Sequence, residues 1–170
     1  MKLELLKYPD ARLRRKSEPV AEITEEIRTL ARDMVETMYA EEGIGLAAPQ
    51  VNRPLRLLVI DLSGPSLREG ATVYINPELE ILDDEKTESE EGCLSVPDLR
   101  APVKRGARVR VKALNLEGIP FTEEADEVKA ICLQHEYDHL EGILFLDHLS
   151  RLKRNLYAHK RKKLLKEENS

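Results

Sequence analysis

The chain has 170 residues, of which 35% are charged, and a formal net charge of −5. This length predicts one domain with a single buried core, and a separate second domain is not expected. The sequence has no apolar run long enough to span a membrane, and its start, MKLELLKYPDARLRRKS, lacks the apolar stretch of a signal peptide, so secretion and membrane insertion are disfavoured.

Cysteine content indicates a reducing compartment. The two cysteines, Cys93 and Cys132, are too few for a disulfide framework. We therefore expect the protein in a bacterial-type cytosol. Abundant Glu, Lys and Arg with only two glutamines resembles the usage of a thermophile, although ordinary variation among small acidic proteins explains it equally well.

The first predicted helix follows Thr24, a residue type that caps helix N-termini. Apolar residues recur at helical spacing until Gly43, which is expected to end the helix: Ile27, Leu30, Ala31, Met34, Val35 and Met38. The next segment, GIGLAAPQ at 43–50, has glycines and a proline that suit a turn or an irregular strand edge. Segments of this kind often carry function.

Three later segments predict strands: LRLLVIDL (55–62), ATVYINP (71–77) and ARVRVKAL (107–114). Between the second and third, DDEKTESEE at 83–91 holds six acids and one lysine, and we interpret it as a solvated loop. It leads into EGCLSVP at 91–97, a short strand-like run.

A second helix is predicted from 123 or 124 to 140, with Gly142 after its end. One stripe of this helix is expected to be buried and contains Val128, Ile131, Cys132, His135 and His139. A third helix is predicted from Leu149 onward. Residues 151–170 hold eight Lys and Arg against two acids, whereas residues 1–150 hold 19 against 30, a charge of −11. Strands followed by helices predict the α+β class.

Two histidines lie four residues apart in His135-Glu136-Tyr137-Asp138-His139. On a helix, residues i and i+4 are neighbours, so both imidazoles can contact one metal ion, and the glutamate can reach a water molecule at that ion. The spacing predicts a metal site with Glu136 as acid or base. The alternative is a chance pattern with two core histidines and a surface glutamate.

A catalytic site of this kind needs a third protein ligand and one open position. Cys132 is unsuitable because the ion would lie level with residue 137, about five residues and ~7.5 Å of helix rise away. A cysteine sulfur reaches only about 4 Å from its Cβ to a metal. We interpret Cys132 as a core residue. Cys93 can approach from a separate element, and we favour it as the ligand over the usual fate of a free cysteine, a small buried side chain.

Three segments, in this order, resemble the signatures of the bacterial peptide deformylase family, which look like GIGLAAPQ, EGCLS and QHExDH. They stand here at 43–50, 91–95 and 134–139, with Tyr137 at the variable position. The similarity covers residues 1–150, which it implies are the catalytic domain. Residues 151–170 would then be a basic helical tail of the same domain.

The resemblance implies an α+β fold in which a central metal-binding helix packs between small, mostly antiparallel sheets, with a further helix at the C-terminus. It implies removal of the formyl group from N-formylmethionine of newly synthesised polypeptides, with release of formate. One divalent metal ion is implied, typically Fe²⁺, with Ni²⁺, Co²⁺ or Zn²⁺ as substitutes. A thiolate and two imidazoles suit zinc and tolerate iron.

The same resemblance implies roles for individual residues. It implies Cys93, His135 and His139 as metal ligands, Glu136 as acid and base, and Gln50 with the Leu94 amide at the oxyanion. The residues expected to bind substrate are Ile44, Gly45 and Arg100 along the cleft, and Val128, Ile131 and Cys132 in an apolar wall for the methionine side chain. Without the resemblance, Gln50 and Arg100 would be interpreted as surface side chains. Ser89 stands where relatives are often apolar, which affects the expected width of the pocket.

Two other functions remain as alternatives. A zinc peptidase shares His-Glu-x-x-His but acts on internal peptide bonds, and the small domain and absence of a further zincin-spaced ligand argue against it. The basic stretch RLKRNLYAHKRKKLLK at 151–166 suggests a non-catalytic ribosome or RNA accessory protein, although an intact metal triad with its glutamate would be superfluous in such a protein. The two functions are compatible, because an enzyme that acts on emerging chains can contact ribosomal RNA through a basic helix. The alternative for the tail is a helix that is merely solvated. No DNA or membrane partner is predicted.

Overall fold

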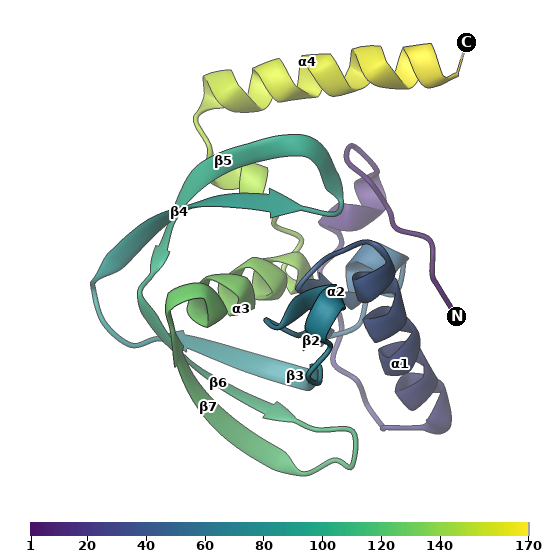
Figure 1. Ribbon diagram of the computed structural model, residues 1–170, viewed down its shortest axis with the longest axis vertical. Helices are drawn as coiled ribbons and strands as arrows, with labels where there is room; N and C mark the ends of the chain where they lie inside the picture. Colours follow the sequence, from purple (N-terminus) through teal and green to yellow (C-terminus); the bar gives the residue numbers. More distant parts are fainter. Residues whose placement is uncertain (170) are drawn as a thin grey trace.

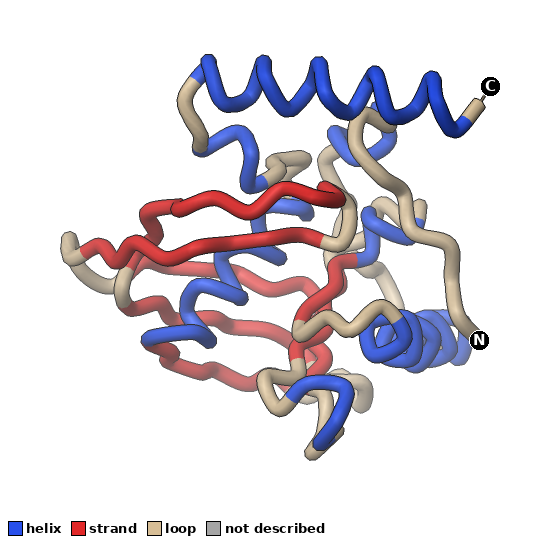
Figure 2. Tube along the Cα trace, turned by 45° about the horizontal axis from the view of Figure 1, so that its top comes forward, coloured by secondary structure: helices blue, strands red, loops and turns tan. Residues whose placement is uncertain are grey.

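Helix α3 (Glu127–Leu140) runs between two antiparallel sheets in the computed structural model, which describes residues 1–169 (Figure 1). The larger sheet has five strands in the order β1-β2-β3-β6-β7, and the smaller is the hairpin β4-β5. Neighbouring strands are antiparallel in both sheets. Figure 2 shows the two groups of strands on either side of this helix. The predicted α+β class is confirmed.

The larger sheet contains the three strands predicted from the sequence. In its strand β6, Val109 and Val111 are buried whereas Arg108 and Lys112 are exposed, as the alternation of residues predicts. All of β2 is buried. The strands of this sheet are β1 (Gly45–Ala47), β2 (Leu57–Ile60), β3 (Thr72–Ile81), β6 (Arg108–Leu114) and β7 (Pro120–Asp126).

Helix α1 (Glu25–Ala40) packs beside β1 and β2 through its apolar face. The Thr24 hydroxyl accepts a hydrogen bond from the Ile27 N–H at 3.4 Å, so the predicted N-cap is confirmed. GIGLAAPQ forms β1 and a short 3-10 turn, which agrees with the predicted irregular strand edge. The short helical segments are η1 (Ala11–Arg14), η2 (Ala48–Val51), α2 (Gly64–Leu67) and η3 (Phe145–His148).

The prediction of a solvated loop at 83–91 is wrong, because most of this run lies in β4 (Lys86–Cys93), which pairs with β5 (Val96–Gly106). Side chains alternate along β4: Glu88 and Glu90 are exposed, whereas Glu91 is buried. Glu88 lies opposite Lys104 of β5, so a cation on the partner strand offsets part of the acidic charge. The high charge concealed a strand periodicity.

The second predicted helix begins later than expected. Residues 123 and 124 belong to β7, and α3 starts at Glu127. Arg110 of β6 donates a hydrogen bond to Glu124 at 2.8 Å. Pairing with β6 therefore overrides the helix preference of the glutamates in this segment.

Helix α4 (Arg151–Glu168) is the predicted C-terminal helix, and it lies across the outer side of the β4-β5 hairpin (Figure 1). It begins after Ser150, whose hydroxyl accepts a hydrogen bond from the Lys153 N–H at 3.2 Å. Within residues 1–169, no helix combines the length and the apolar character needed to cross a membrane.

Candidate metal and active site

Two elements bring three potential metal ligands together. Cys93 ends β4, and His135 and His139 lie one turn apart on α3. The Cys93 Sγ and one ring nitrogen of each histidine all lie within 4.8 Å of one another. The Sγ is 3.4 Å from His139 Nε2, and the centroids of the two imidazole rings are 5.2 Å apart.

This donor set fits a divalent metal ion. One thiolate and two imidazoles are common zinc ligands and are tolerated by iron. Bonds of about 2.0–2.3 Å to a shared ion place tetrahedral ligand atoms roughly 3.5 Å apart. The distance between Cys93 Sγ and His139 Nε2, 3.4 Å, agrees with that spacing. The same geometry suits several divalent ions.

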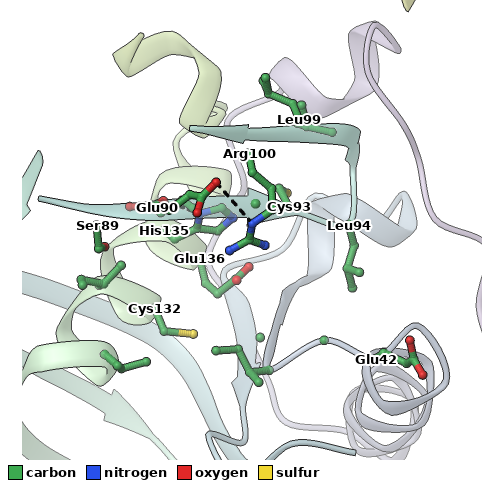
Figure 3. A pocket seen from close by; sticks show the side chains of 18 of the residues that line it. Glu42, Ser89, Glu90, Cys93, Leu94, Leu99, Arg100, Cys132, His135 and Glu136 are labelled. Atoms are coloured by element: carbon green, nitrogen blue, oxygen red, sulfur yellow. Dashed lines mark hydrogen bonds and ion pairs between the residues drawn. The ribbon is translucent and has the colours of Figure 1, made fainter. Parts of the chain in front are cut away.

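Glu136 points into the cavity beside these ligands (Figure 3). It is 5% exposed, and its Oε1 has no hydrogen-bond partner within residues 1–169. This Oε1 lies 4.0 Å from His139 Nε2. Burial raises the pKa of Glu136 to about 7, although the neighbouring His135 acts in the opposite direction. The burial excludes a surface position for this carboxyl group, and its unpartnered oxygen leaves a proton acceptor beside the ligand cluster.

Strand β1 approaches α3 so closely that residue 45 has no room for a side chain. A Cβ atom on Gly45 would lie 2.7 Å from Glu136 Oε2 and 3.0 Å from Cys132 Sγ. Real Cβ atoms do not approach other atoms so closely, so a larger residue at position 45 would have to displace the Glu136 carboxyl group or the Cys132 thiol. The GIGLAAPQ motif therefore shapes the wall opposite α3.

A buried ion-pair network, which was not predicted from the sequence, supports the His135 ring at Nδ1. Glu91 lies 2.9 Å from His135 Nδ1 and accepts two hydrogen bonds of 2.9 Å from Arg105. Arg105 also donates to Asp138 at 2.6 Å. Burial alone would raise the pKa of Glu91, but the hydrogen bonds with Arg105 and His135 lower it to about 2. A carboxylate at Nδ1 fixes the ring and leaves Nε2 available to a metal.

Part of this network had a signal in the sequence. Glu91 lies two residues before Cys93, and side chains two apart on a strand share a face. Asp138 lies within the histidine motif itself. Arg105 had no local signal, because it reaches Glu91 only through the pairing of β5 with β4.

Gln50 is held with its amide group beside the Cys93 thiol. Its Oε1 accepts a hydrogen bond from the Ala47 N–H at 2.9 Å, and its Nε2 donates to Ser95 Oγ at 3.0 Å and lies 3.6 Å from Cys93 Sγ. At 2% exposure, Gln50 is not a solvent-facing side chain. Leu94 and Ser95 form the turn between β4 and β5, directly after Cys93. Ser95 is a further residue of this site that was not predicted from the sequence.

The ligand cluster opens into a cavity of about 590 Å³ (Figure 3). Its lining includes every residue expected to bind substrate: Ile44, Gly45, Arg100, Val128, Ile131 and Cys132. Cys132 is buried and does not belong to the three-ligand cluster. Ser89 lines the same cavity, and Glu90 and Arg100 form a mostly exposed ion pair of 3.9 Å.

Several proteins that are similar to this chain in sequence or in structure are named peptide deformylase. The polypeptide deformylase family matches residues 2–155. The chain is 50% identical to a peptide deformylase of Acinetobacter baumannii (strain SDF) over 165 residues, which covers 97% of this chain and 93% of that protein. A crystal structure of a peptide deformylase from Legionella pneumophila has a TM-score of 0.91 and 42% identity, and covers 99% of this chain and 98% of that one. A peptide deformylase from Ehrlichia chaffeensis in complex with actinonin has a TM-score of 0.89 and 39% identity, with coverage of 95% and 96%. The chain therefore belongs to the polypeptide deformylase family.

Proposed function

We infer that this chain removes the formyl group from N-formylmethionine of newly synthesised polypeptides and releases formate, and that the reaction takes place at the Cys93, His135 and His139 cluster. The observation that supports this most is the position of the buried Glu136 beside these ligands in one cavity. A zinc peptidase has less support, because the chain matches deformylases over nearly its whole length.

We propose that the cluster holds one divalent ion, Fe²⁺ in the native protein, which Ni²⁺, Co²⁺ or Zn²⁺ can replace. The donor set supports a divalent ion, and the family resemblance supports iron. When bound, the ion supplies Lewis-acid activation, which lowers the pKa of water from about 15.7 towards 7. The Glu91 carboxylate would keep His135 in the tautomer that binds metal through Nε2.

Glu136 is proposed to carry the proton. It accepts a proton from the attacking water, whose oxygen forms a bond to the formyl carbon. It then returns the proton to the nitrogen as the carbon–nitrogen bond breaks. The products are formate and a free amino terminus. Its buried, unpartnered oxygen supports this role because no protein group competes for it among residues 1–169.

Gln50 and Leu94 are proposed to stabilise negative charge on the formyl oxygen. The Gln50 amide lies beside Cys93 and is fixed by its bonds to Ala47 and Ser95. The Leu94 N–H follows Cys93 directly in the turn. Preorganised donors of this type contribute about 10²–10³ each to the rate in other enzymes.

The cavity suits a peptide with an apolar first side chain. Ile131 and the buried Cys132 form an apolar wall that matches a flexible thioether. Val128 lines the same cavity, but it is 57% exposed, so the expectation that it is buried is wrong. Strand β1 is at the edge of its sheet, so the backbone around Ile44 and Gly45 offers hydrogen bonds to an extended peptide. We propose that Arg100 holds the peptide backbone at the cavity mouth.

We further propose that residues 1–150 form the catalytic domain and that 151–170 is a tail of the same domain that contacts ribosomal RNA in the bacterial cytoplasm. The eight Lys and Arg of the tail support this, because basic helices bind phosphate backbones. The bacterial sources of the relatives support the location.

The test is anaerobic purification with metal analysis, followed by formate release from a formyl-Met peptide. The matched control is the same peptide without the formyl group. We expect formate from the first peptide and no cleavage of the second. Cleavage of internal bonds in both peptides would support the peptidase instead.

A further inference from the structure

Helix α4 is attached to the rest of the molecule by hydrogen bonds and by the ring of Tyr157, and not by a continuous apolar stripe. Of its described residues, Tyr157 and Arg161 are buried, whereas Leu152 and Leu156 are 69% and 63% exposed. The Tyr157 hydroxyl donates a hydrogen bond to the Pro97 carbonyl at 2.7 Å. One turn later, Arg161 Nε donates to the backbone carbonyl of residue 8 at 3.0 Å. Each acceptor belongs to a segment that contacts the active site.

The first acceptor lies in a bulge of β5. Gly92 pairs with Arg100, and the next residue, Cys93, pairs with Val96, so residues 97–99 have no opposite residue on β4. Tyr157 satisfies a carbonyl that the strand ladder leaves out.

The Pro97 carbonyl that accepts the Tyr157 hydrogen bond is followed directly by strained backbone beside the cavity. Asp98 has a φ of +63°, which residues other than glycine rarely adopt. Asp98 and Leu99 line the cavity. A hydrogen bond to the Pro97 carbonyl fixes the peptide plane that joins Pro97 to Asp98, so Tyr157 holds this strained segment in place.

The second acceptor belongs to an N-terminal segment that binds both sides of the oxyanion region. The Tyr8 N–H donates to the Ser95 carbonyl at 2.8 Å, and the Leu6 N–H donates to the Gln50 carbonyl at 2.7 Å. Arg161 binds Tyr8, and the ring centroids of Tyr8 and Tyr157 are 5.5 Å apart. Arg161 thus reaches the turn after Cys93 through a single intervening residue.

The hydroxyl of Tyr157 is a permanent donor. Burial raises the pKa of Tyr157 to about 12, so this group stays protonated throughout the physiological range. Its ring belongs to the same apolar cluster as Val96, and Cys93 packs against that cluster.

We propose that Tyr157 and Arg161 are positioning residues for the reaction. They hold the 97–99 bulge and the turn at Leu94 and Ser95, and so keep Cys93 and the Leu94 N–H in place. Neither side chain touches the reacting atoms. This inference rests on the proposed function, and it makes α4 part of the architecture of the active site in addition to any role in docking.

The test compares Tyr157→Phe, which removes one hydroxyl, with Leu156→Ala, which alters an exposed neighbour on the same helix. Arg161→Met and the exposed Lys160→Met form a second matched pair. Backbone hydrogen exchange is measured on the zinc-loaded proteins without substrate, and kcat and KM are measured with a formyl-Met peptide. Both controls should match wild type.

We expect about fivefold faster exchange across residues 94–99 in Tyr157→Phe, the equivalent of one lost hydrogen bond. We expect kcat to fall three- to tenfold, or about 1 kcal/mol of transition-state stabilisation, with KM within twofold. For Arg161→Met, faster exchange should extend to residues 6–8.

Unchanged exchange at 94–99, or faster exchange confined to α4, would overturn the proposal. The exchange measurement needs no turnover, so it tests the hold on residues 94–99 separately from the deformylase reaction. Faster exchange there with an unchanged kcat would also overturn the positioning role. Absence of formate from the wild-type protein would instead refute the proposed function.

Discussion

Glu136 carries an unpartnered carboxylate oxygen in the interior of the described chain. An unsatisfied buried polar atom costs stability, and such costs persist where function requires them. His139 Nδ1 is also buried and lacks a partner within residues 1–169. Glu91, by contrast, is buried with hydrogen-bond partners for both carboxylate oxygens, Arg105 and His135. We therefore propose different tasks for the two carboxylates near His135: Glu91 orients the ring, and Glu136 exchanges a proton.

Replacing Glu136 with Gln should lower kcat by about 10²–10⁴, the usual contribution of a general acid–base group. Metal content should not change, because Glu136 is outside the three-ligand cluster. Formate release and elemental analysis measure the two quantities. The control is Glu127→Gln, an exposed glutamate at the start of the same helix, which should behave like wild type. A kcat for Glu136→Gln close to that of wild type would refute the assignment.

Replacing Gln50 with Leu should lower kcat by about 10²–10³ with little change in KM, because an oxyanion donor acts mainly in the transition state. Steady-state kinetics with a formyl-Met peptide measures both constants. If KM rises while kcat stays constant, Gln50 binds the substrate in its ground state and the oxyanion role is wrong.

The β4-β5 hairpin positions the thiol, and α3 positions the imidazoles. Much of this arrangement was predictable from local patterns, since His135 and His139 share a helix face by spacing alone and Thr24 caps α1 as expected. The strand β4 was not predictable from its charge. Six acids in nine residues suggest solvation, yet alternation and pairing with β5 place Glu91 in the interior. Pairing with another strand decides whether such a charged segment is a strand or a loop, and a single sequence does not reveal that pairing.

Arg105 tests how much this hairpin depends on its buried charges. Arg105→Met should reduce the free energy of unfolding of the metal-free protein by about 3–5 kcal/mol, because Glu91 would remain buried without its partner. The control is Arg110→Met, which breaks partly exposed ion pairs with Glu80 and Glu124 and should cost about 1 kcal/mol or less. Chemical denaturation of both variants measures the difference. Equal decreases in the free energy of unfolding of the two variants would show that the buried network stabilises the protein no more than the exposed ion pairs do.

Charge is divided between the two parts of the whole molecule. Residues 1–150 carry −11, and the tail carries eight cations against two acids. This division was visible in the sequence, and so was the helix. The attachment of α4 was not, because Tyr157 and Arg161 bind backbone carbonyls of Pro97 and Tyr8, far away in the chain. No periodic apolar pattern marks such contacts.

If the tail binds ribosomal RNA, reversing exposed charges should weaken that contact without affecting chemistry. We expect the triple variant Lys153→Glu, Lys160→Glu and Lys163→Glu to bind ribosomes more weakly and with a shallower salt dependence, because fewer phosphates are neutralised. Co-sedimentation at several salt concentrations measures this. Formate release from a short peptide should match wild type. Unchanged sedimentation would leave the tail without a ribosomal role.

The most direct test of the whole account is the metal content of two cysteine variants purified anaerobically. Cys93→Ala removes the proposed sulfur ligand, and Cys132→Ala removes a buried sulfur of the same cavity that lies outside the cluster. We predict that Cys132→Ala keeps the metal content of wild type and that Cys93→Ala loses it. Full metal content in Cys93→Ala would contradict the proposed site.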